Sequence, residues 1–136
     1  MTRVLSSAAL AAAFLFGSVV PASAAMLVVK LTAVGGSGQN GRAVLTDLPP
    51  IGGPRISVSA TVANEPLPAI EPSHIHRGVC GSNGPILRPL HNVVHGQMAT
   101  TIVAGFTTAQ LHAMHTYINI HKSAGALGVI VSCGNI

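Results

Sequence analysis

The sequence predicts an all-β fold, an antiparallel sandwich or barrel of about seven strands. Three observations predict it. Short runs rich in β-branched residues recur along the chain, glycines and prolines separate these runs, and helical periodicity is confined to one segment. The chain has no internal repeat and no interdomain linker, so we expect one domain over residues 25–136.

The first three strands are expected in the first half of the chain. Met26–Ala33 is rich in β-branched residues and runs into a glycine-rich turn at 35–38. Arg42–Thr46 is a second such run, closed by Pro49-Pro50. Arg55–Val62 alternates between apolar and polar residues, which is the period of a strand with one buried face.

The second half adds four expected strands and one short helix. These strands are Ser73–Arg77, Met98–Val103, Tyr117–Lys122 and Leu127–Cys133. A helix of one or two turns is expected at Thr107–Met114, where a threonine can serve as the N-cap. Val79–Gln97 is the longest segment without strand character.

Residues 36–41, Gly-Ser-Gly-Gln-Asn-Gly, match the pattern G-x-G-x-x-G directly after a predicted strand. That pattern binds a dinucleotide only where its last glycine opens a helix whose N-terminus meets the pyrophosphate. Here the strand-like Arg42–Thr46 follows instead. We therefore interpret the segment as a hairpin loop.

Residues 1–24 have the features of a secretory signal peptide. Arg3 gives a positive start, residues 4–20 are uncharged and apolar, and Ala22-Ser23-Ala24 is a small-residue cleavage site just after the helix-breaking Pro21. An uncleaved membrane anchor is the alternative. Cleavage predicts an exported protein, periplasmic or secreted, with no stable insertion in a membrane.

The composition excludes several functions. Basic residues are scattered singly and aromatic residues make up only 3% of the chain, so it lacks the basic stripe and stacking aromatics of a nucleic-acid module. Only three carboxylate side chains exist, Asp47, Glu65 and Glu71, which is too few for catalysis built on paired carboxylates. High hydropathy with little charge also excludes a disordered chain. The residue type in excess is histidine, with seven copies.

Two cysteines, Cys80 and Cys133, would meet an oxidising compartment after export. A disulfide between them is the simplest interpretation, and closing a loop of this length would stabilise the fold by roughly 4 kcal/mol. A metal site and a reactive thiol are the alternatives.

The histidine pattern is the sharpest local signal. His74 and His76 are two residues apart on a predicted strand, so their side chains share one face about 7 Å apart. The expected Tyr-Ile-Asn-Ile-His strand places Tyr117, Asn119 and His121 on one face in the same way. If the two strands are neighbours, three imidazoles can converge on one cation, and imidazole suits copper and zinc. Half-exposed surface histidines are the alternative.

Four other histidines carry weaker signals. His91 and His95 are four residues apart, but the valines and glycine around them disfavour a helix that would pair them. His112 and His115 fall in the expected helical turn. For both pairs we expect exposed polar residues, with an auxiliary or fourth metal ligand as the alternative.

The order of several motifs resembles the copper/zinc superoxide dismutase family, in particular a short and divergent bacterial branch of it. The motifs are His74–His76, Cys80, Gly84-Pro85, Ile120-His121-Lys122 and Ser132–Ile136. The chain is also similar to CHRD-type domains, which share the two histidine strands. The resemblance covers residues 26–136. It implies an eight-stranded Greek-key β-barrel or sandwich and an intramolecular Cys80–Cys133 disulfide.

The resemblance also implies a copper site with one ion per chain. The implied ligands are His74, His76 and His121, and Asn119 on the same face is the candidate group for orienting them. The family's metal-bridging histidine falls here at Ile86, so His91 is the candidate for a fourth ligand.

Other family features have no counterpart in this chain. No carboxylate follows Glu71, so we do not expect a zinc site of the family type. The arginine with which the family attracts superoxide falls here at Ile130, which leaves Arg77 and Arg88 as candidates for steering the anion.

Three functions therefore compete. The first is a copper-dependent superoxide dismutase of reduced design, acting on superoxide or a related small anion. The second is an exported, non-catalytic copper binder. The third is a metal-free β-sandwich serving as an envelope or adhesion module. The sequence points to no particular protein partner.

Overall fold

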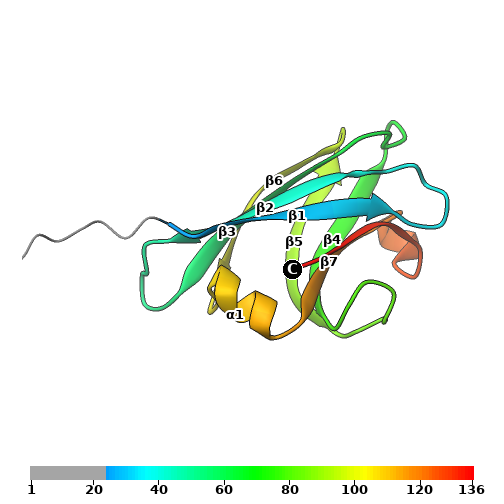
Figure 1. Ribbon diagram of the computed structural model, residues 1–136. Coiled ribbons are helices and arrows are strands. Elements are labelled where there is room, and N and C mark those ends of the chain that lie inside the picture. The colour runs from blue at the N-terminus through cyan, green and yellow to red at the C-terminus, as the bar shows by residue number, and fades with distance from the viewer. Residues whose placement is uncertain (1–23) are drawn as a thin grey trace, which may run out of the picture.

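The structure, a computed structural model, describes residues 24–136 and consists mainly of β-strands. The strands are β1 (Met26–Ala33), β2 (Gly41–Leu48), β3 (Arg55–Val62), β4 (Ile70–Arg77), β5 (Ile86–Val94), β6 (Gln97–Ala104), β7 (Thr116–His121) and β8 (Ile130–Asn135). A short helix, α1 (Thr108–Ala113), lies between β6 and β7, and a 3-10 turn at Ala124–Ala126 precedes β8 (Figure 1).

The eight strands close into one antiparallel barrel in the order β1-β2-β3-β6-β5-β4-β7-β8. The barrel is closed by pairing of Thr32 in β1 with Cys133 in β8. Because β3 pairs with β6, and β4 with β7, two connections pass over the ends of the barrel instead of joining neighbours. This is a Greek-key arrangement, so the predicted all-β fold is confirmed.

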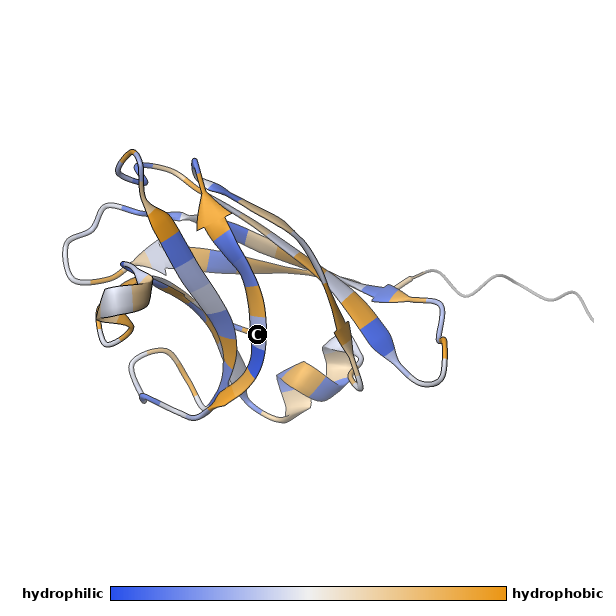
Figure 2. Cartoon of the chain, turned by 180° about the vertical axis from the view of Figure 1, so that it is seen from behind, coloured by the Kyte–Doolittle hydropathy of each residue, from blue (hydrophilic) through white to orange (hydrophobic). Residues whose placement is uncertain are grey.

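In several strands, β3 among them, alternate residues fill the interior of the barrel. Ile56 and Val58 of β3 are fully buried, as their alternating pattern predicts, and Ile75 of β4 and Ile118 and Ile120 of β7 join them. Figure 2 shows the resulting change between apolar and polar residues along the strands. Burying each such side chain contributes about 1.5–3 kcal/mol before the entropy of ordering is counted.

One expectation was wrong: the segment predicted to lack strands contains β5, at Ile86–Val94. Its alternation is obscured because only Leu90 and Val93 are buried, while Pro89 interrupts the run of strand-forming residues. The register with β4 also shifts at two places, so the inward-facing positions do not keep a period of two. Pairing with β4 on one side and β6 on the other holds this strand in the barrel.

The remaining elements lie close to their expected positions. Thr107 caps α1, and its side chain and that of Gln110 form reciprocal hydrogen bonds with each other's backbone N–H groups. The G-x-G-x-x-G segment forms the loop between β1 and β2, as predicted, and its last glycine, Gly41, begins a strand. β8 starts three residues later than expected because the turn that begins with the 3-10 residues Ala124–Ala126 continues through Gly128.

The predicted signal segment, residues 1–24, lies outside the described residues except for Ala24. Within residues 24–136 no helix is long and apolar enough to cross a membrane.

Candidate metal centre

The candidate site lies on the outer face of two neighbouring strands, β4 and β7. In their antiparallel register His74 is opposite Asn119 and His76 is opposite Tyr117. Side-chain alternation sends Ile75 into the core, so the two β4 histidines point to the other face. The adjacency on which the histidine hypothesis depended is therefore present.

Three histidines converge on this face. One ligand nitrogen from each of His74, His76 and His121 lies within 4.8 Å of the other two. Their ring centroids are 5.0 Å apart for His74 and His121, 5.6 Å for His74 and His76, and 5.7 Å for His76 and His121. Nitrogens bound at about 2.0–2.1 Å to one cation lie about 3.3–3.5 Å apart, so the three rings would have to close in by at most about 1.5 Å to bind it. The cluster can therefore hold one metal ion.

Hydrogen bonding fixes which nitrogen of His76 is available. Its Nδ1 lies 2.8 Å from the carbonyl oxygen of Gly84, and a carbonyl only accepts, so Nδ1 carries the proton and donates. The lone pair is then on Nε2, which is buried and has no hydrogen-bond partner. The ring also stacks on Tyr117, with centroids 5.2 Å apart and an interplanar angle of 22°.

Gly84 connects the two stacked rings. Besides accepting from His76, its N–H donates to the Tyr117 hydroxyl at 2.9 Å. A Cβ atom at this glycine would lie 1.6 Å from the carbonyl oxygen of Arg77, so no other residue fits without moving the loop. The loop is tied back to β4 by a hydrogen bond from the Arg77 N–H to the carbonyl of Pro85, at 3.0 Å.

The Cys80–Cys133 disulfide holds the same loop from the other side. The bond joins the segment after β4 to β8, with Cα atoms 5.9 Å apart. The Cys80 N–H also donates to Oδ1 of Asn135 at 2.8 Å. The predicted disulfide is confirmed, and no cysteine is left free to bind a metal as thiolate.

The environment of the cluster favours the neutral form of two of its histidines, His74 and His121. Burial lowers the pKa of His74, and the nearby His121 and His76 add to the effect. Burial also lowers the pKa of His121. The nearby His76 lowers this pKa further, whereas the backbone carbonyl of Leu127 acts in the opposite direction. A neutral imidazole has the lone pair that a metal needs.

Several polar atoms at the site have no hydrogen-bond partner. They are Nδ1 of His74, Nε2 of His76, both ring nitrogens of His121, and Oδ1 of Asn119. Buried polar atoms are nearly always satisfied, so such a group at one place marks a site that is completed by something else. A metal ion at the three rings would take one nitrogen from each of them.

The carboxylates of the chain lie elsewhere. Asp47 accepts from the Thr108 N–H, Glu65 from the Gly96 N–H, and Glu71 from Gln39. The metal-binding group within residues 24–136 thus contains imidazoles alone, and it includes none of these carboxylates.

The other candidate residues are not brought into the cluster. His91 is exposed on β5 and is not part of the three-histidine group. His95, His112 and His115 are exposed as well.

The two candidate steering arginines differ. Arg77 is exposed at the end of β4, next to His76 in the chain. The guanidinium of Arg88 lies 4.9 Å above the ring of Phe106, and Arg88 pairs with the core-facing Ile75. Arg88 is thus engaged with an aromatic ring, and the role of either arginine in steering an anion stays a prediction.

Two supporting residues were not assigned a role from the sequence. Tyr117 was expected on the histidine face, but its stacking on His76 depends on the register of β4 and β7. Gly84 was noted only as part of a Gly-Pro pair, and its contact with Arg77 depends on the path of the loop.

The geometry assigns this face a capacity for metal binding and leaves the metal itself open. Comparisons with protein-family models, with curated proteins and with solved structures found no match for this chain.

Proposed function

We propose that this protein binds one copper ion through His74, His76 and His121. The observation that carries the proposal is the convergence of three imidazoles, each with one ligand nitrogen within 4.8 Å of the other two and at least one ring nitrogen that has no hydrogen-bond partner. The ring of His76 is already held with Nε2 free, so little entropy is lost on binding.

Copper is favoured by the donor set. An all-imidazole group suits copper, zinc and nickel, and among divalent ions copper binds such a group most tightly. Structural zinc sites usually have four protein ligands, whereas this group has three. Three nitrogens with an open position suit both oxidation states of copper.

Export is part of the proposal. It is supported by the signal-like sequence of residues 1–24 and by the Cys80–Cys133 disulfide, a bond that persists in oxidising compartments. The periplasm and the extracellular space fit equally well.

Metal titration tests the binding. The oxidised chain from residue 25 onward is stripped with a chelator and titrated with Cu(II) and Zn(II) by calorimetry, with EPR of the copper form. We expect one Cu(II) per chain, bound more tightly than about 10 μM and more tightly than zinc. His76→Ala should abolish this binding, whereas His112→Ala, at an exposed histidine on α1, should leave it unchanged. Equal losses in the two variants, or no saturable binding, would contradict the proposal.

The fourth-ligand question has its own measurement. His91→Ala should leave the nitrogen hyperfine pattern of the copper EPR spectrum unchanged, because His91 is exposed on β5 and outside the cluster. Loss of one nitrogen from that pattern would show a four-histidine site instead.

Superoxide dismutation is a second candidate function. His74 is only partly buried, so a small anion has access to the cluster from solvent. The chemistry that copper supplies is one-electron exchange: one superoxide ion is oxidised to dioxygen, and a second is reduced and takes up two protons to give hydrogen peroxide. The chain's net charge of +4 favours approach of an anion, with Arg77 as the nearest candidate for steering.

Superoxide decay measured on the copper-loaded protein separates these functions. Decay faster than that given by an equal amount of chelated copper, and lost in His76→Ala, supports the enzyme. Tight binding without faster decay leaves a non-catalytic copper binder. No binding leaves a metal-free β-barrel with an envelope or adhesion role.

A further inference from the structure

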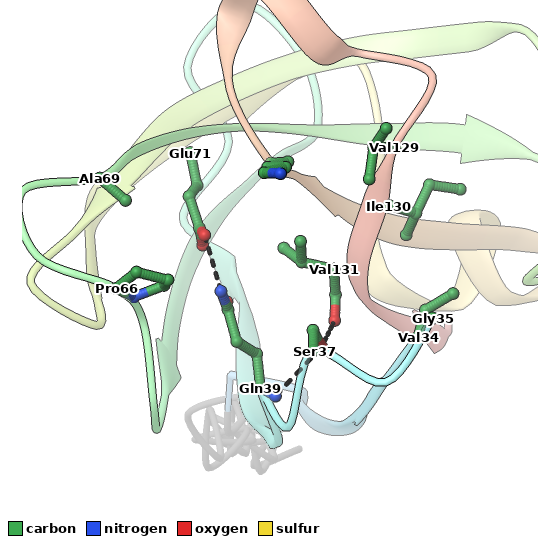
Figure 3. A pocket seen from close by; sticks show the side chains of 11 residues that line it. Val34, Gly35, Ser37, Gln39, Pro66, Ala69, Glu71, Val129, Ile130 and Val131 are labelled. Carbon is green, nitrogen blue, oxygen red and sulfur yellow. Dashed lines mark hydrogen bonds between the residues drawn. The ribbon is translucent and has the colours of Figure 1, made fainter.

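A cavity lies at one end of the barrel, and none of the three clustered histidines lines it. It has a volume of about 350 Å³, within the range of sites for small molecules. Its wall is formed by the β1–β2 loop, the segment leading into β4, and the chain from Lys122 to the start of β8. Most of the lining is apolar, including Val129, Val131 and Pro66 (Figure 3).

Two buried polar side chains face this cavity, Glu71 and Gln39. They are 1% and 2% exposed, and Figure 3 shows them pointing toward one another. Nε2 of Gln39 donates to Oε1 of Glu71 at 2.7 Å. Oε2 of Glu71 and Oε1 of Gln39 have no hydrogen-bond partner. The cavity therefore contains two unused acceptors beside each other.

A buried carboxylate in this position lacks a compensating charge. Burial raises the pKa of Glu71, the hydrogen bond from Gln39 opposes this, and Glu65 adds to it. Lys122 is part of the cavity lining, but it is exposed and makes no hydrogen bond with the free Oε2. A group that brings N–H donors and a positive charge to these two oxygens would satisfy both.

We propose that this cavity binds a small primary amine, with its ammonium group on Glu71 and Gln39 and its hydrocarbon part against the apolar wall. An ammonium group has three N–H donors, enough for both free acceptors, and pairs with the carboxylate. A carboxylate ligand would face Glu71 with like charge, and an alcohol has only one donor and no charge.

This site is separate from the proposed copper site. Glu71 lies on the core side of β4, whereas His74 and His76 lie on the outer face of the same strand. Because amines also bind copper, the test uses the chelator-treated protein, and its outcome does not depend on whether the chain binds copper.

The test compares three probes of one shape: benzylamine, benzyl alcohol and benzoate. Binding to the full mature chain is measured by NMR titration with methyl assignments. We expect 1:1 saturable binding of benzylamine with shifts at Val129, Val131 and Ala69, at least about tenfold weaker binding of benzyl alcohol, and none of benzoate. Equal binding of amine and alcohol, preferred binding of benzoate, or no saturable binding would overturn the proposal.

Two substitutions test the assigned contacts. Glu71→Gln keeps the shape of the side chain and should weaken benzylamine by about tenfold or more while sparing benzyl alcohol. Asp47→Asn is the matched control, since Asp47 is not in the cavity lining and its Oδ1 can still accept from the Thr108 N–H; it should leave the affinity within about twofold.

Lys122→Met tests whether the cavity prefers a positively or a negatively charged ligand. It removes the only cationic side chain of the lining, so it should tighten benzylamine binding. Weaker benzylamine binding in Lys122→Met, or an unchanged affinity in Glu71→Gln, would show that the assigned contacts are wrong. Circular dichroism of each variant checks that it is folded.

Discussion

Replacing Gly84 by alanine should damage the metal centre without touching a metal ligand. The added Cβ would lie 1.6 Å from the carbonyl oxygen of Arg77, and real Cβ atoms do not come closer than 3.0 Å to such an atom. The two groups must therefore separate by at least 3.0 − 1.6 = 1.4 Å. Twisting of a flexible side chain cannot relieve this overlap, because both atoms belong to or are fixed by the backbone.

A shift of that size breaks the contacts that orient His76. Its hydrogen bond to the Gly84 carbonyl is 2.8 Å long and is lost beyond about 3.5 Å. The Gly84 N–H would also leave the Tyr117 hydroxyl. Two lost hydrogen bonds, one of them leaving a buried ring nitrogen unpaired, amount to about 2–4 kcal/mol. Lost orientation of a ligating histidine should weaken metal binding by about 10–100-fold.

The assay pairs urea denaturation with copper titration, and Gly125→Ala is the matched control. Gly125 has open space around the position of a Cβ, so alanine there should change neither stability nor affinity appreciably. Tyr117→Phe provides a milder variant that removes only the hydroxyl and should cost about 1 kcal/mol. If Gly84→Ala matches Gly125→Ala in both measurements, the idea that Gly84 holds His76 in place is wrong.

Three further predictions concern pH, the disulfide and the buried carboxyl. Folding holds the pKa of His74 and His121 below 6.5, so the unfolded chain binds protons first as the pH falls below that value, and the metal-free protein should lose stability there. Urea denaturation from about pH 8 to 5 measures this loss, and the dependence of the unfolding free energy on pH should be weaker in a variant with both residues changed to glutamine. Removing the disulfide by Cys80→Ser with Cys133→Ser opens a loop with a sequence separation of 53 residues, and urea denaturation should show a loss of roughly 4 kcal/mol in the unfolding free energy. Copper titration of the same variant should show weaker binding. Folding raises the pKa of Glu71 above 4.5, so the buried carboxylate lowers the stability of the protein once the pH rises above that value. Glu71→Gln should therefore raise the unfolding free energy at neutral pH by about 1 kcal/mol. A less stable variant would contradict the idea that the Glu71 charge is uncompensated.

The sequence predicted the histidine face because a strand has a strict period of two. His74 and His76 had to share a face, and the strand ending in His121 had to send its isoleucines inward. Periodicity does not specify which strands pair, because pairing joins segments that are far apart in the sequence. The prediction that these two strands are neighbours therefore depended on the family resemblance. The distances between the rings then depended on a register that only the folded barrel provides.

What could not be predicted depends on loops and on irregular strands. β5 was missed because Pro89 and two register shifts hide its alternation, although its neighbours supply the hydrogen bonds that keep it a strand. The contact between the Arg88 guanidinium and the ring of Phe106 likewise has no signal in the sequence, because it joins two separate segments. The Glu71 cavity combines residues from three separate segments, and no local pattern in any one of them predicts it.

The stacking of Tyr117 on His76 has a practical consequence. The chain contains one tyrosine and no tryptophan, so a single side chain dominates its ultraviolet fluorescence. That ring lies 5.2 Å from a ring of the proposed copper site. A paramagnetic ion held there would quench the emission at close range. The fluorescence of Tyr117 would thus report whether copper occupies the proposed site, without an attached label.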